Sequence, residues 1–455
     1  MLEIHKQDAR NKMQEIMTIL KTIFKTMALY GATLLSPCLL PAQNLTLKDA
    51  VNIALKNSPG LLIAKNGVDI ASIYNSYGYA GGLPLVTASG SDVEQSTSLK
   101  QKYFDPANNK SSLNAASNNV SGGLNASMLL YNGDRVSTAK KRLGVQESQT
   151  RQQLSSRALF IVYNVMLKYY DIIRQQNYSK TLQTSIDASR ERLNIVKSQQ
   201  SIGLANNADL FQSQVDLNTT LQNLQAQRLV VDQDKTDLLT LLTLNPDSSV
   251  SIADTIVVTK DIRLESIING LQANPDIVAA DDQIRINSYI EKETGALRYP
   301  SVGVNTGYNY SRTQQAAGFS LLNLNYGPFA GVSFNIPIFN GLIYRKQQQV
   351  AGINTKTSKL QKDTLVLNYT ANAVKSWQAY TSSLQQLETA KSNYDLSKQL
   401  LDLVLQRFEL RQATIVDVRD AQQSFENAGY MLTNLSFAAK MAEVQLLRYA
   451  NQLSY

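Results

Sequence analysis

Apolar and polar residues alternate in four short segments of this chain and recur with a helical period in much longer ones. The alternation is clearest in residues 301–310, where aromatic and β-branched side chains fall on one face and small or polar ones on the other. One face carries Val302, Val304, Thr306, Tyr308 and Tyr310. We therefore predict two pairs of strands. They lie at about 84–96 with 118–131, and at about 300–313 with 328–339.

The longer segments predict helices of unusual length. Residues 133–199 contain no proline and, after Gly133, only one further glycine, Gly144. The apolar residues step by three and four, as in a coiled coil, and a single helix of this length measures on the order of 100 Å. We expect two antiparallel helix hairpins, at 133–243 and 342–451. Taken alone, such hairpins also fit a rod-like scaffold without a pore.

The order of strands and helices occurs twice, which indicates an internal duplication. Pro59 matches Pro275 at an offset of 216 residues, and Pro84 matches Pro300 at the same offset. From Asn132 onward the matching residues of the second repeat follow at an offset of 208, so only the loop within a strand pair differs in length. The predicted repeats cover residues 43–250 and 251–455.

Residues 1–42 have the pattern of an export signal peptide. Lys21 and Lys25 precede an apolar stretch of about 14 residues, which is shorter than the roughly 20 that a membrane-spanning helix needs. The only cysteine, Cys38, lies in this stretch and follows a weak match to a lipoprotein cleavage box. Cleavage after Ala42 is the favoured interpretation, and lipidation of Cys38 is the alternative.

Strands of about ten residues with one apolar and one small-polar face are typical of a transmembrane barrel, with the apolar face toward lipid. A half-buried strand of a soluble sandwich is the alternative. Glycine and asparagine on the polar face favour the barrel. Four strands cannot close a barrel, and an open edge in lipid leaves backbone groups unpaired. A membrane-spanning role therefore requires several chains to share one barrel.

Composition narrows the possible functions. The net charge of +8 is spread along the chain without a dense lysine or arginine cluster, so a nucleic-acid partner is not expected. The mean hydropathy of −0.21 argues against a bundle of membrane-spanning helices. The single histidine, His5, lies in the leader, and no nucleophile, acid–base pair or phosphate-binding glycine motif appears. We therefore predict no enzymatic activity, no cofactor and no metal site; an exported surface hydrolase would need a catalytic pair that is absent.

Local motifs of both repeats resemble those of TolC-type outer-membrane efflux proteins, the outer membrane factors. The motifs are the segment 45–55, the Asn-Gly turns at 132–133 and 340–341, and above all 406–422, QRFELRQATIVDVRDAQ. The resemblance covers essentially all of residues 43–455. It implies an α+β membrane protein in which three chains form one 12-stranded β-barrel, four strands from each. A long α-helical coiled-coil barrel would continue that barrel.

The same resemblance implies a location and a set of partners. The protein would lie in the outer membrane of a Gram-negative bacterium, in contact with outer-membrane lipid and with its helices in the periplasm. As a homotrimer it would meet a periplasmic adaptor, or membrane fusion, protein and an inner-membrane pump of the resistance-nodulation-division or ABC type. The expected function is the passive exit duct of a tripartite efflux or type I secretion system. A structural periplasmic coiled-coil protein without a pore is the alternative.

Asp417 and Asp420 match the aspartates that, in such proteins, narrow the tunnel at the periplasmic tip. They are three residues apart and so share one face of a helix. Three chains would stack two acidic rings, which would concentrate cations in a narrow bore. Asp417 also stands where the carboxylate of a capping box belongs, with Thr414 as N-cap. The two roles are compatible, and Asp209 repeats the pattern in the first hairpin.

The gate is where the sequence departs from the family pattern. An aromatic hydroxyl and an arginine often bind the neighbouring hairpin there, but the matching positions hold Phe408 and Ala413. Candidate gate contacts are therefore Asp209, Phe408 and Arg411, with Arg419 as another possible arginine. We expect closure to depend more on packing than on a polar latch. The exported substrate cannot be derived from the sequence.

Overall fold

The computed structural model describes residues 43–317 and 320–453. The predicted export signal at 1–42, with Cys38, lies outside these residues. The described chain divides into two units. In the smaller one, β1 (Gln43–Asn44) pairs in parallel with β4 (Val250–Ser251), and the backbone N–H of Leu45 donates to Ser251 O at 2.9 Å. The larger unit contains the remaining described elements.

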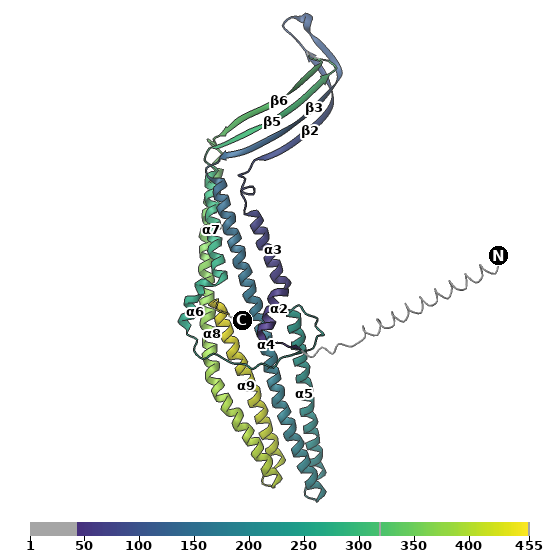
Figure 1. Ribbon diagram of the computed structural model, residues 1–455, viewed down its shortest axis with the longest axis vertical. Helices are drawn as coiled ribbons and strands as arrows, with labels where there is room; N and C mark the ends of the chain where they lie inside the picture. Colours follow the sequence, from purple (N-terminus) through teal and green to yellow (C-terminus); the bar gives the residue numbers. More distant parts are fainter. Residues whose placement is uncertain (1–42, 318–319, 454–455) are drawn as a thin grey trace, which may run out of the picture. The chain divides into compact units, whose positions relative to one another are not determined.

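Four antiparallel strands form one sheet in the larger unit, in the order β2-β3-β5-β6 (Figure 1). They are β2 (Leu85–Gln101), β3 (Lys110–Tyr131), β5 (Ser301–Gln315) and β6 (Leu322–Asn335). Strand β3 of the first repeat pairs with β5 of the second, so the sheet continues across the duplication. Met128, Val304 and Val332 are direct neighbours in this register and form an apolar row on one face.

The strand bounds differ from the expected ones for reasons of backbone pairing. Strand β2 continues to Gln101 and β3 begins at Lys110, so both extend into polar sequence. The hydrogen-bond ladder uses backbone groups, and it therefore continues where the apolar alternation has ended. Strand β6 begins at Leu322 and ends at Asn335, before Pro337, which has no N–H to donate to a ladder.

The apolar side of the sheet is open. Leu124, Leu322, Val332 and Phe334 are all exposed, and in the described chain no helix covers the sheet (Figure 1). An apolar surface of this size marks a contact with lipid or with another protein. Separately, no helix among residues 43–317 and 320–453 is both long enough and apolar enough to cross a membrane.

The helices repeat in number and length. The first repeat contains α2 (Leu47–Asn57), α3 (Pro59–Tyr74), α4 (Arg135–Ser201) and α5 (Asn207–Leu241). The second contains α6 (Leu264–Gly270), α7 (Pro275–Ala296), α8 (Ile343–Glu409) and α9 (Ile415–Tyr449). Two short 3₁₀ helices are η1 (Pro106–Asn108) and η2 (Leu271–Ala273). Helices α4 and α8 have 67 residues each, and α5 and α9 have 35 each, which supports the duplication.

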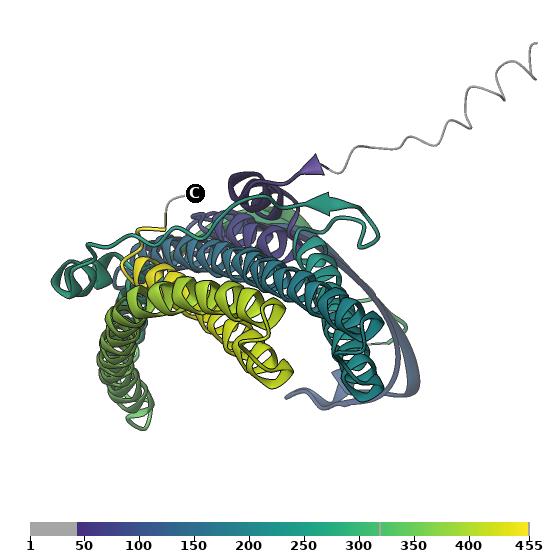
Figure 2. The same ribbon diagram turned by 90° about the horizontal axis from the view of Figure 1, so that it is seen from below.

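The long helices pair and then pack on one another. Helix α4 runs beside α5, and α8 beside α9, while α9 also packs against α4 (Figures 1 and 2). Helix α7 contacts both α4 and α8, whereas α3 packs on α4. The residues at the centre of α4, among them Val165, Tyr169 and Ile172, are completely buried. Helix α4 is thus enclosed by partners from both repeats.

Candidate functional site

The turn between α8 and α9 is set by a backbone motif at the end of α8. The N–H of Gln412 donates to Arg407 O at 2.7 Å, and the N–H of Arg411 donates to Phe408 O at 3.1 Å. These are the two hydrogen bonds of a Schellman motif. Arg411 has a left-handed backbone with φ of 63°, a conformation that favours glycine. Its side chain is exposed, so Arg411 first of all forms the turn.

Helix α9 begins with a complete capping box. The Thr414 hydroxyl accepts the N–H of Asp417 at 3.2 Å, and the Asp417 carboxylate accepts the N–H of Thr414 at 2.7 Å. The backbone N–H and then the hydroxyl of Thr414 lower the pKa of Asp417 below its ordinary value of 3.8, with a further contribution from Arg407. Asp417 therefore stays ionised at neutral pH and orders the start of the helix.

Asp420 lies one helical turn beyond Asp417. Both side chains are exposed, while Val418 between them is completely buried, so the two carboxylates occupy the outward side of α9. Within the described chain, the Asp420 carboxylate has no ion pair or hydrogen bond. The structure therefore brings Asp417 and Asp420 together on one exposed face, as their spacing requires.

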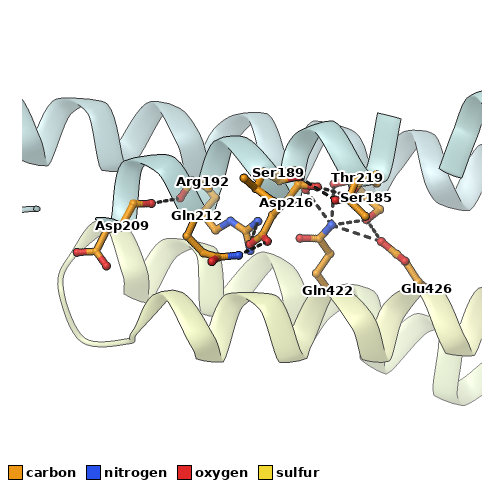
Figure 3. Close-up of polar contacts among 12 residues, drawn as sticks. Ser185, Ser189, Arg192, Asp209, Gln212, Asp216, Thr219, Gln422 and Glu426 are labelled. Atoms are coloured by element: carbon orange, nitrogen blue, oxygen red, sulfur yellow. Dashed lines mark hydrogen bonds and ion pairs between the residues drawn. The ribbon is translucent and has the colours of Figure 1, made fainter. Parts of the chain in front are cut away.

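The turn between α4 and α5 has the same design with different residues. Gly203 takes the left-handed position with φ of 75°, and its N–H donates to Gln200 O at 2.9 Å. Asn206 caps α5 by accepting the N–H of Asp209 at 2.8 Å. In the described chain the Asp209 carboxylate does not bond back to Asn206, and it makes no ion pair with the other turn. Asp209 is therefore a free carboxylate at the first turn (Figure 3).

Phe408 belongs to a small apolar core rather than to an exposed surface. It is buried with Ile195 and Val196 of α4 and with Val418 of α9. Gln199 adds a hydrogen bond from its amide to Phe408 O at 3.4 Å. The end of the second hairpin is thus attached to α4 by packing, and Phe408 offers no polar group at the turn.

A buried ion pair, which the sequence analysis did not identify, lies deeper in the first hairpin. Arg192 of α4 is completely buried and donates to Asp216 of α5 at 2.8 Å (Figure 3). Gln212 donates to the other oxygen of Asp216 at 2.7 Å. The Nε and Nη1 atoms of Arg192 have no partner. Burial lowers the pKa of Arg192, while Asp216 acts in the opposite direction.

A polar cluster next to this ion pair joins the two hairpins. Gln422 of α9 donates to Ser185 Oγ at 2.6 Å and to Ser189 Oγ at 2.8 Å, and both serines are completely buried in α4 (Figure 3). Glu426 accepts hydrogen bonds from Ser185 and from Gln422. Buried polar groups that are fully hydrogen-bonded fix one alignment of the helices they join.

One signal in the sequence could have identified this region. The second-repeat counterparts of Arg192 and Asp216, at the offset of 208, are Leu400 and Ser424. An ion pair in one repeat with neither charge in the other indicates a function specific to one seam. Separately, residues 43–317 and 320–453 contain no group of three or more histidine, cysteine or carboxylate side chains placed to hold a metal ion.

Comparison with known proteins agrees with this architecture. The family model "Outer membrane efflux protein" matches residues 50–243 and 268–452. The outer membrane protein TolC of Vibrio cholerae is 23% identical over 360 residues, which cover 74% of this chain and 77% of TolC. The crystal structure of the outer membrane protein VceC from the same species is similar with a TM-score of 0.73 at 18% identity, and covers 89% of this chain and 95% of VceC. The CmeC outer membrane channel of Campylobacter jejuni gives a TM-score of 0.74 at 16% identity, covering 89% of this chain and 85% of CmeC. At these identities the structures establish the fold.

Proposed function

This chain belongs to the outer membrane efflux protein family, and on that basis we propose that it is the exit duct of a three-part export system. The family and the structurally similar proteins are outer-membrane channels rather than enzymes, and this chain is an outer-membrane efflux protein. In the proposal, three copies form one passive conduit from the periplasm to the exterior. A periplasmic adaptor and an inner-membrane pump would load it.

The observation that supports this proposal most strongly is the four-stranded sheet with an open apolar face. Its outer strands, β2 and β6, each have one edge without a strand partner in the described chain. In lipid such edges must be paired. Three sheets of four strands, joined β6 to β2, make a closed barrel of twelve. The exposed apolar rows then face lipid, and the small polar residues face the interior.

We assign the entry of the conduit to the exposed carboxylates at the start of α9. Three copies of Asp417 and Asp420 form two acidic rings one helical turn apart. A narrow bore with walls of low dielectric concentrates the field of such rings and favours cations. The capping box helps, because the bonds from Thr414 hold the Asp417 carboxylate ionised and fixed in place.

The closed state of this entry depends on packing in the proposal. Phe408 anchors the second turn to α4 through the apolar core with Ile195, Val196 and Val418. The polar cluster of Gln422 and Glu426 holds the same helices above it. Asp209 and Arg411, exposed on the two turns, are the candidate gate contacts between neighbouring hairpins. The adaptor would act on the turns, where the fewest contacts hold the helices.

The test is single-channel recording in planar bilayers with the detergent-purified protein, after its mass has been measured in detergent. We expect a trimer and a cation-selective conductance that added multivalent cations block. The double variant Asp417→Asn with Asp420→Asn should lose much of that selectivity and block. Asp247→Asn, which removes one exposed carboxylate far from α9 in sequence, is the control for net charge. Unchanged selectivity in the double variant would leave Asp417 with its capping role alone, and a monomer without conductance would overturn the channel assignment.

A further inference from the structure

Helix α8 carries an exposed apolar stripe along its first half. The residues are spaced by seven, three, seven and seven, so they lie on one side of the helix. They are between 55% and 68% exposed. The stripe consists of Ile343, Val350, Ile353, Leu360 and Leu367. A stripe of this length on one helix face is expected to pack against another helix.

Helix α3 carries a second exposed stripe. Ile63, Ile70 and Ile73 lie on the side of α3 that faces away from α4, and all three are exposed. The opposite side of α3 packs on α4, where Gly67 lies in ordinary contact with Thr150. Helix α3 thus has one partner and one free face.

The duplication identifies what should cover both stripes. Helix α7, the counterpart of α3, packs on α8 of its own repeat and also on α4 of the other repeat. Its contacts with α4 include an ion pair from Arg142 to Glu293 at 2.7 Å and a hydrogen bond from Gln149 to Gln283 at 2.9 Å. In this interface Ile286 of α7 is only 4% exposed.

The repeat offsets convert these residues into the two exposed stripes. With an offset of 216, Ile286 corresponds to Ile70 of α3. With an offset of 208, Arg142 corresponds to Val350 of α8 and Val145 to Ile353. Ile286 and Val145 are buried, whereas their counterparts Ile70 and Ile353 are exposed. The faces that are covered between α7 and α4 are therefore uncovered between α3 and α8.

We propose that α8 of one copy receives α3 and α5 of the next copy, in the register that α4 uses for α7 and α9 within the chain. This inference rests on the proposed assembly of several copies and specifies its helical interface. The contact is heterologous, because repeat two of one copy meets repeat one of the next, and such contacts close into rings. The upper half of α8 takes α3, with Ile353 packing near Ile70.

The lower half of α8 takes α5 by the same argument. Helices α8 and α9 form a groove of about 850 Å³ that is lined by Thr389, Asn393 and Leu400 among others. The counterpart surface of α4 is covered by α9, where a Cβ on Gly429 would lie 3.0 Å from Thr181 Cβ. The matching residues between copies are Leu221 of α5 and Thr389 of α8. Leucine in place of glycine makes this seam wider than the one within the chain.

The position of the strands gives independent support for a second copy as the occupant. Strand β6 runs into α8, and α3 runs into β2. The free edges of β6 and β2 and the free faces of α8 and α3 therefore follow one another along the chain. Pairing β6 with β2 of the next copy places α8 and α3 at the same seam, as β3–β5 pairing accompanies the α4–α7 contact within the chain.

Paired cysteines test this register. The variant Leu221→Cys with Thr389→Cys should give, after mild oxidation, a ladder of products that ends at three chains. The matched variant Gly429→Cys with Thr181→Cys carries the same pair within one chain and should close without a change in mass, since its Cβ atoms lie near disulfide distance. Each single substitution is the control for reaction through any other thiol.

A second pair examines the upper half in case the first is poorly folded. Ile70→Cys with Ile353→Cys, treated with a short bismaleimide, should also produce covalent trimers, and Gln283→Cys with Gln149→Cys is its control within the chain. If the protein is a trimer by mass and both controls react while neither test pair links copies, the interface is wrong although the assembly stands. A monomer by mass that yields no linked copies overturns both proposals.

Discussion

The seam between α4 and α9 and the matching face of α8 occupy the same positions of the two repeats, yet they differ in chemistry. The α4 side buries Ser185, Ser189 and Arg192. The α8 side has Asn393, Ser397 and Leu400 at these positions, and Asn393 and Leu400 are exposed. One repeat thus encloses a charge, whereas the other presents an uncharged groove.

The two sides also differ in how closely a second helix can approach. Gly429 brings α9 so near to α4 that an added Cβ would lie 2.4 Å from a methyl group of Thr181. Leu221 is the counterpart of that glycine on α5 and does not permit the same approach. Close contact and a buried polar network make a seam with one alignment, and an open groove permits sliding. The comparison teaches that the hairpins within a chain are held more firmly than hairpins of neighbouring copies in the proposed assembly.

The largest effect is expected when the buried ion pair is broken on one side. In Asp216→Ala, Arg192 remains buried without its counter-ion, which destabilises the seam by about 3–5 kcal/mol. Hydrogen exchange of backbone amides in α4 and α5 near the pair should accelerate by about two to four orders of magnitude, at 1.4 kcal/mol per factor of ten. Exchange in α8 should not change.

The matched control replaces the pair with the residues of the second repeat. Arg192→Leu with Asp216→Ser copies Leu400 and Ser424, so no charge is left buried. Such replacements are often neutral or stabilising, and exchange should stay near the wild-type rate. If Asp216→Ala exchanges as slowly as the double variant, the ion pair is not what distinguishes the two repeats.

An intermediate effect is expected from exchanging the residues of the two turns. Arg411 holds a left-handed conformation that costs a non-glycine residue about 1–2 kcal/mol, and glycine relieves it while adding about 0.4–1 kcal/mol of unfolded-state entropy. Arg411→Gly should therefore stabilise the second turn by about 0.5–1 kcal/mol in chemical unfolding. Gly203→Arg should destabilise the first turn by a similar amount, because nothing but the backbone opposes a side chain there.

The same exchange separates a turn residue from a gate residue. If Arg411→Gly changes only stability, Arg411 serves the turn alone. If the variant also raises the closed-state leak in planar bilayers, its guanidinium is a gate contact as well. Lys398→Gly, in the exposed middle of α8, is a control for glycine substitution and should destabilise by about 1 kcal/mol.

The sequence was sufficient for the fold because the duplication and the periodicity are both long-range patterns. The proline-free stretch after Gly133 predicts α4, and the equal repeat offset predicts that α8 matches it. Strand ends were less accurate, since backbone pairing continues beyond the apolar residues near Gln101 and Lys110. Periodicity reports burial averaged along a face, and backbone ladders leave no such trace.

The site was harder to derive for a different reason. Arg192 and Gln422 are polar residues in apolar surroundings, and which helix lies opposite them is decided by tertiary packing. Phe408 stood next to the turn in sequence, but its position in the core with Val418 follows only from the way α9 folds back. Asp417 is the residue whose capping role both the sequence and the geometry support.

The smallest effect concerns this carboxylate and its counterpart Asp209. The pKa of Asp417 is lower in the folded protein than its ordinary 3.8, so its contribution to stability is complete above that pH and is lost as the pH falls through the lowered value. Unfolding midpoints measured from pH 5 downward should therefore fall less steeply for Asp417→Asn than for the wild type. Asp209→Asn should follow the wild-type curve, because Asn206 caps α5 without a bond from the Asp209 carboxylate. Equal slopes for all three proteins would mean that the capping box does not distinguish the second turn from the first.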